Sequence, residues 1–186
     1  MGDLACLQDL HERGYAWDAS TCTAAAQGGH LACLIYAHIR GCPWDKKTCY
    51  MAAYNGQLAC LNYAHRNGCL WDEDTLFQAS YNGHLACLMY AHDHGCPWDN
   101  FTSSATAGKG HIACLMYAHK NGCPWDELTC REAAENGQFT CLAYAHENGC
   151  PWGDETLAVA ARNGHLDCLV RRTSNRTQHH RTQSDV

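Results

Sequence analysis

The chain has 186 residues and a formal net charge of −6 at pH 7. Its last 17 residues contain four arginines and one aspartate, a charge of +3, so the rest of the chain carries −9. An acidic surface repels the phosphate backbone of nucleic acids. No apolar run reaches the roughly 18 residues that a membrane-spanning helix requires, and no signal peptide is recognised. We therefore expect a cytoplasmic protein that has no nucleic-acid partner and no membrane partner.

The sequence consists of one short unit copied in tandem. A tryptophan recurs every 27 residues without an insertion, and such a constant interval is typical of a solenoid of stacked units. In chain order we expect a half-repeat at 2–18, units of the same length up to residue 169, and a basic, disordered tail at 170–186. Residues 1–169 thus form one predicted array, and its tryptophans are Trp17, Trp44, Trp71, Trp98, Trp125 and Trp152.

Each unit is predicted to form two helices joined by a turn. In one such unit, Asp45 caps a first helix of about nine residues that closes at Gly56. An apolar stripe from Leu58 then predicts a second helix of about eleven residues that ends at Gly68. We call the first helix of a unit helix A and the second helix B. Strict alternation of apolar and polar residues is absent, so we expect an all-α fold.

The tryptophan and aspartate that precede helix A are predicted to have structural roles. Helices this short are marginally stable alone and must be held by their neighbours. We expect the indole to wedge between consecutive hairpins, where its burial contributes about 2 to 3 kcal/mol. Besides the six tryptophans, the predicted structural residues are the helix-capping aspartates Asp45, Asp72, Asp99 and Asp126.

Cysteine and histidine are the residue types that could support metal chemistry. Equivalent cysteines of stacked units lie about 10 Å apart, beyond the reach of a disulfide, so we expect reduced thiols that fill small apolar sites. Within one unit, His30, Cys33, His38 and Cys42 are possible metal ligands, yet no C-x-x-C pair with a matching second half is present. We therefore expect no metal. The ring of His38 should instead pack and bond a carbonyl near the end of its helix.

Catalysis is not predicted either. A catalytic site needs a unique constellation of side chains, whereas every candidate nucleophile, acid or base here recurs from unit to unit. A residue copied in this way serves the fold first. We expect neither an enzyme nor a bound cofactor.

The core of the unit resembles the ankyrin repeat. The stretch A-A-x-N-G-H-L-x-C-L with a following G-C, as from Ala25 to Cys42, is similar to A-A-x-x-G-H-x-x-I-V-x-x-L-L-x-x-G-A of that family. The family's unit has 33 residues, and the six that are missing here fall between Gly41 and Thr48, where ankyrin repeats carry a β-hairpin finger. The resemblance covers residues 2–169. It implies an α-solenoid of stacked helix-turn-helix repeats that lacks most of these fingers and binds proteins.

The P-W-D sequence before helix A is a further point of resemblance. It is similar to the short ankyrin-like repeats of giant DNA viruses of amoebae and of some protists. If the chain is viral, the resemblance implies a host protein as the partner and the host cytoplasm as the location.

The predicted binding site lies at the positions that differ between units. Positions that keep one residue type in every unit serve the fold, so the variable positions are free to contact a partner. They gather on helix A and just after its capping aspartate, where aromatic and charged side chains should form a stripe along the stack. The candidate partner-binding residues are Lys46, Lys47, Tyr50, Met51, Tyr54, Asp74, Phe77, Gln78, Tyr81, Phe101, Ser104, Leu128, Arg131 and Glu135.

These patterns predict a non-enzymatic scaffold that binds a protein along the helix A face. The alternative is a Cys/His-rich repeat protein that responds to metal or to redox state. The last repeat abandons the consensus after Leu169 and lacks a polar cap, so we also expect self-association through that end.

Overall fold

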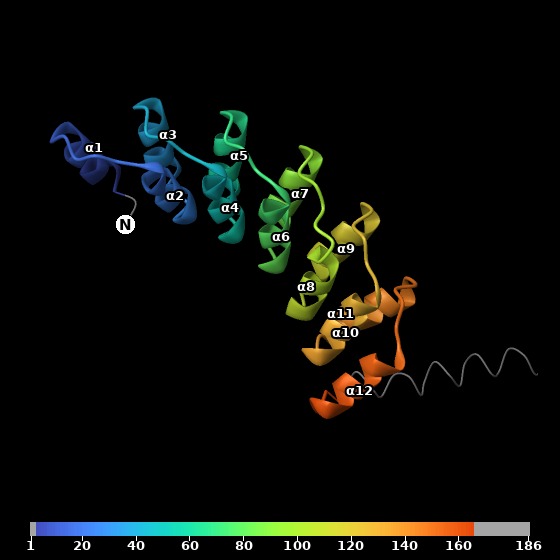
Figure 1. Cartoon of the computed structure of the whole chain (residues 1–186). Coiled ribbons are helices and arrows are strands. Elements are labelled where there is room, and N and C mark those ends of the chain that lie inside the picture. Colours follow the sequence, from blue (N-terminus) through green and yellow to red (C-terminus); the bar gives the residue numbers. More distant parts are fainter. Residues whose placement is uncertain (1–2, 166–186) are drawn as a thin grey trace, which may run out of the picture. The chain divides into compact units, whose positions relative to one another are not determined.

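The structure is a computed structural model, and it describes residues 3–165. Within that range the chain forms helices joined by turns and contains no strand (Figure 1), which confirms the all-α fold and the loss of the β-hairpin fingers. None of these helices is long and apolar enough to cross a membrane. The helices are α1 Leu4–Glu12, α2 Ala19–Gln27, α3 Leu31–Ile39, α4 Lys46–Tyr54, α5 Leu58–Arg66, α6 Glu73–Tyr81, α7 Leu85–Asp93, α8 Thr102–Lys109, α9 Ile112–Lys120, α10 Glu127–Glu135, α11 Phe139–Glu147 and α12 Asp154–Arg162.

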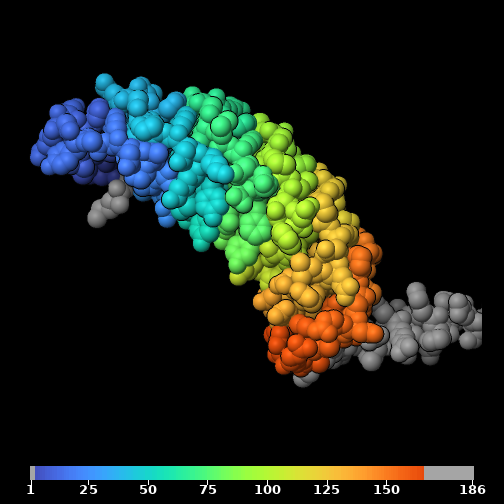
Figure 2. Space-filling model, viewed as in Figure 1, coloured from blue at the N-terminus to red at the C-terminus, as the bar shows by residue number. Residues whose placement is uncertain are grey.

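The helices belong to two compact parts of the chain. In the first, Met1–Asp99, the A helices α2, α4 and α6 pack side by side in that order. Each B helix, α3, α5 and α7, packs against the A helix that precedes it and against the B helix of the neighbouring hairpin. The half-repeat supplies only α1, which packs on α3. Figure 2 shows these successive hairpins in contact, from blue to green.

The second part, Asn100–Val186, repeats the same arrangement. Its A helices α8, α10 and α12 pack in order, and its B helices α9 and α11 pack on each other. The predicted end of the array at residue 169, its uncapped last repeat and the basic tail 170–186 lie outside the described residues. The expectations that concern them remain predictions.

The aspartate that precedes helix A caps it in most units but not in all. The side chains of Asp18, Asp45 and Asp126 each accept a hydrogen bond from the backbone N–H two residues later, at 2.8 to 2.9 Å. Asp72 makes no such bond, and its carboxylate accepts a hydrogen bond from Lys46 instead. Asp99 is not a cap, because α8 begins only at Thr102 with Phe101 as its N-cap residue. The capping role predicted for Asp72 and Asp99 is therefore wrong.

The core is built from small side chains. Its largest fully buried apolar residues are leucines, and no aromatic side chain is fully buried among residues 3–165. The prediction of an indole wedged deeply between hairpins is therefore corrected: Trp44 is half-buried. In the central hairpin of the first part, the buried residues are Thr48, Cys49, Ala52 and Ala53 of α4 and Cys60, Leu61 and Ala64 of α5.

Candidate functional site

The predicted partner-binding residues of the first part lie on two neighbouring A helices. Lys46, Lys47, Tyr50, Met51 and Tyr54 belong to α4, and the other four belong to α6, which packs against α4. Both lysines and Tyr54 are exposed, whereas Tyr50 and Met51 are half-buried. On α6, the exposed residue is Asp74, and the half-buried ones are Phe77, Gln78 and Tyr81.

Aromatic rings form a pair on each of these two helices. The rings of Tyr50 and Tyr54 stack with centroids 6.4 Å apart, and those of Phe77 and Tyr81 stack at 5.7 Å. Both pairs have the i, i+4 spacing that places side chains on one helix face. Tyr54 is 41% exposed, which is high for so large an apolar group. The structure thus brings the predicted aromatic residues together as two adjacent pairs.

The charges beside these pairs have both signs. The ammonium of Lys46 donates to the carboxylate of Asp72 across the two helices. This hydrogen bond, with the negative charge of Asp72, raises the pKa of Lys46 above its ordinary value. Lys47, Glu73 and Asp74 are exposed close by in sequence. The aromatic pairs are therefore flanked by charged groups at the start of both helices.

The candidate residues of the second part are more varied. Phe101 is 60% exposed, and Arg131 and Glu135 are exposed on α10, where Leu128 is half-buried. Ser104 is only 5% exposed, and its hydroxyl donates to the Phe101 carbonyl at 3.0 Å. A buried, bonded serine offers little to a partner, so Ser104 does not belong to the surface that we propose below.

A second repeated arrangement was not predicted from the sequence. The ring of His38 lies flat on Trp44, with centroids 3.8 Å apart, and its Nδ1 shares a hydrogen bond of 2.8 Å with the Tyr63 hydroxyl of the next hairpin. Trp44 meets the Tyr63 ring edge-on at 6.2 Å. The same three rings recur at His65, Trp71 and Tyr90 and at His119, Trp125 and Tyr144.

These rings correct the role expected for His38. Its partner is a tyrosine of the next unit and not a helix-terminal carbonyl. The carbonyl is bonded instead by the histidine that precedes helix B: His84 Nε2 lies 3.1 Å from the Tyr54 carbonyl at the end of α4. In the equivalent of His38, burial first, and then His94 and Arg66, lower the pKa of His65. The recurrence of a tyrosine two residues before each such histidine was the signal available in the sequence.

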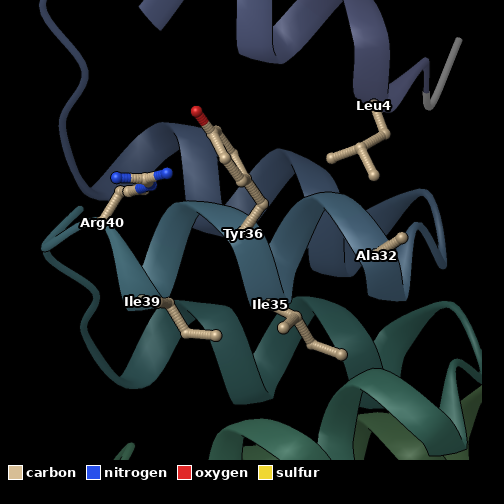
Figure 3. Close-up of a pocket in the computed structure, with 6 residues that line it drawn as sticks. All are labelled: Leu4, Ala32, Ile35, Tyr36, Ile39 and Arg40. Carbon is tan, nitrogen blue, oxygen red and sulfur yellow. The ribbon is translucent and has the colours of Figure 1, made fainter.

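The B helices carry an open hollow of about 480 Å³ at the start of the first part (Figure 3). Leu4 of α1 faces Ala32 and Ile35 of α3 across it, and Ile39 extends the apolar lining. Arg40 lies at one end, with its guanidinium 5.5 Å from the ring centre of Tyr36. The hollow is local, because the residues that correspond to Ile35 and Ile39 in the next unit are Asn62 and Arg66.

The stacked helix-turn-helix hairpins and their glycine-closed turns define an ankyrin-type repeat fold. Comparison with models of protein families gives no match, and comparison with curated proteins gives none either. Among solved structures, the chain is similar to the crystal structure of the human ASB11 ankyrin repeat domain, with a TM-score of 0.73 and 20% identity over 82% of each chain. This likeness confirms the fold class, an α-solenoid of ankyrin-like repeats.

Proposed function

We propose that the protein is a non-enzymatic scaffold that binds one protein partner along the helix A face of α4 and α6. The observation that supports this most directly is the pair of aromatic stacks, Tyr50 with Tyr54 and Phe77 with Tyr81, on adjacent helices. The ankyrin-repeat fold is a general protein-binding scaffold, which supports the class of function.

Comparison of the units within the chain supports the choice of face. The buried positions of α4 and α6 are occupied by threonine, cysteine or leucine, and alanine or serine, which close the stack. The aromatic positions have no such packing role, since α10 has Arg131 and Glu135 in the places of Tyr50 and Tyr54. Tyrosine and arginine are common anchors of protein interfaces, and tyrosine offers both an apolar ring and a hydroxyl.

The recurrent histidines and thiols support a non-catalytic role. His38, His65 and His119 each stack on a tryptophan and bond a tyrosine, so the same residue performs the same structural task in three units. A nucleophile or base at work in one active site would require a unit that differs from the others. The similarity of the P-W-D units to repeats of giant DNA viruses further supports a host protein, met in the host cytoplasm, as the partner.

The test is affinity measurement with a partner first identified by cross-linking in host cytoplasm and then purified. Substituting alanine for Tyr50, Tyr54, Phe77 and Tyr81 together should weaken binding at least 100-fold, because aromatic anchors dominate interface energies. A milder variant, Lys47→Glu with Tyr54→Glu, changes exposed positions only and should weaken binding while leaving the helical circular dichroism signal intact.

The matched control lies on the helix B side. Asn62→Ala with Met89→Ala alters variable positions of α5 and α7 and should leave the affinity unchanged. If the helix B variant loses the partner while both helix A variants bind it normally, the proposed face is wrong.

A further inference from the structure

A buried cysteine after each helix B packs on the first turn of the helix A of its own hairpin. The thiol of Cys42 donates to the Asp18 carbonyl at 3.2 Å, and those of Cys69 and Cys150 donate to the carbonyls of Asp45 and Asp126 at 3.1 Å. Each of the three cysteines is 3 to 4% exposed. The turn that follows helix B is thus tied to the N-terminus of helix A through a sulfur atom.

A second cysteine, the fourth residue of helix A, faces the first in three of these hairpins. Cys22 Sγ lies 3.9 Å from the Cys42 carbonyl, and Cys49 Sγ lies at the same distance from that of Cys69. Cys130 faces Cys150 in the same way and forms a side-chain hydrogen bond with it. Cys22, Cys49 and Cys130 have no exposed surface. The spacing of 20 residues concealed these pairs, because sequence reasoning compared only equivalent cysteines.

The unit that carries serine at this place shows how close the two side chains are. Ser103 Oγ donates to Cys123 Sγ at 3.1 Å. In another unit the residue facing Cys96 is Leu76. The chain therefore contains three thiol pairs, one serine–cysteine pair and one leucine–cysteine pair at equivalent positions.

The two sulfurs of a pair differ in acidity. Cys49 donates a hydrogen bond to the sulfur of Cys69, which lowers the pKa of Cys69 and raises that of Cys49. The bond between Cys130 and Cys150 has the same effects on that pair. The sulfur with the lowered pKa also accepts the backbone N–H of its partner, near the positive end of helix A. One sulfur of each of these pairs is thus prepared to become a thiolate.

The donor set limits the ligand. Structural zinc takes four protein ligands, yet within residues 3–165 no three histidine, cysteine or acidic side chains come together as a possible metal site. Two sulfurs separated by a few ångströms can satisfy a two-coordinate ion, since two metal–sulfur bonds of about 2.3 Å span up to about 4.6 Å. Thiolates favour soft ions, of which Cu(I) is the physiological example.

We propose that the three thiol pairs, Cys22 with Cys42, Cys49 with Cys69 and Cys130 with Cys150, are binding sites for a two-coordinate soft metal ion, Cu(I). Each site forms when Cu⁺ displaces the two thiol protons, which leave to solvent, and no electron is transferred. The bound ion joins the turn after helix B to the first turn of helix A. This site is separate from the aromatic face and is additional to protein binding.

The test is an anaerobic titration of the reduced, metal-free full chain with Cu(I) in competition with a chromogenic Cu(I) chelator. The parent should bind three equivalents. The variant with Cys22→Ser, Cys49→Ser and Cys130→Ser should bind none, and it should remain folded because the chain itself has Ser103 at this position. The matched control, with Cys33→Ala, Cys60→Ala and Cys141→Ala on the B helices, should still bind three.

A gain-of-site variant makes the test independent of lost stability. Ser103→Cys creates a fourth thiol pair with Cys123 by exchanging one oxygen for sulfur, and the stoichiometry should rise from three to four. The proposal is overturned if the triple serine variant binds as many equivalents as the parent, or if Ser103→Cys adds none while its circular dichroism shows a folded protein.

Discussion

The histidine near the end of helix B connects two hairpins through a single ring. His65 lies flat on Trp71 of the following loop, with centroids 3.8 Å apart, and bonds the Tyr90 hydroxyl of the next hairpin at 3.0 Å. Trp71 meets Tyr90 edge-on at 6.1 Å. Stacked and edge-to-face pairs each contribute about 0.5 to 1.5 kcal/mol beyond the area that they bury. The half-buried indole therefore stabilises the contact between hairpins even though it lies outside the core.

We expect Trp71→Ala to lower the free energy of unfolding by about 2 to 3 kcal/mol, somewhat less than the cost of truncating a fully buried tryptophan. Tyr54→Ala is the control, because this ring is exposed and its loss should cost no more than about 0.5 kcal/mol. Urea unfolding followed by circular dichroism measures both. Equal midpoints for the two variants would show that the three-ring arrangement contributes little to stability.

At the scale of the helices, the end of each helix A is joined to the next hairpin. Helix α4 closes at Gly56, whose φ of +70° lies in the left-handed region that favours glycine. His84 of the next hairpin bonds the last carbonyl of α4 at Tyr54. A Cβ atom on Gly56 would come within 2.6 Å of His84 Nδ1, so the histidine fits there only because the side chain is absent.

We expect Gly56→Ala to destabilise the protein more than Gly68→Ala. Both glycines have positive φ, which costs alanine roughly 1 to 2 kcal/mol, but only Gly56 also has a side chain in the way of a Cβ. Thermal melts of both variants would show this difference. In a His84→Ala background the extra cost should vanish, and a cost of Gly56→Ala that stays the same would rule out the contact as its cause.

The helices were more predictable from the sequence than the contacts between them. The start of α4 after Asp45 and its end at Gly56 follow from local capping chemistry, so its nine residues agree with the prediction. Helix α5 also spans nine residues, two fewer than expected, because it ends at Arg66, before the turn at Gly68. Contacts between units depend on side-chain directions that a one-dimensional pattern does not contain.

The candidate site shows the same limit. The aromatic residues of α4 and α6 were identified correctly as lying on neighbouring A helices, because the repeat register relates equivalent positions. Ser104 occupies an equivalent position and is nevertheless buried, since a small side chain can turn back onto its own helix start. The pairing of Cys22 with Cys42 also escaped prediction, because it joins two different positions of one hairpin.

At the scale of the whole molecule, stability comes from many small contacts between neighbouring hairpins. Each A helix packs on the next A helix within its part of the chain, and each hairpin repeats the same buried threonine, cysteine, alanine and leucine positions. Such an array gains its stability from the sum of its interfaces and not from one large core. The buried loop thiols already donate to carbonyl groups, so every hairpin is closed without a ligand.

We therefore expect that removing metal leaves the fold intact. Treatment of the reduced protein with EDTA or phenanthroline should change neither the helical circular dichroism signal nor the Tm, because the thiols are held by hydrogen bonds and by packing. A zinc-finger protein treated in parallel is the positive control, since structural zinc contributes directly to folding. Unfolding on chelation, with release of stoichiometric zinc, would mean that the repeats are metal-dependent. Subsequent addition of Cu(I) to the chelator-free protein should raise the Tm, because a ligand that binds only the folded state stabilises it.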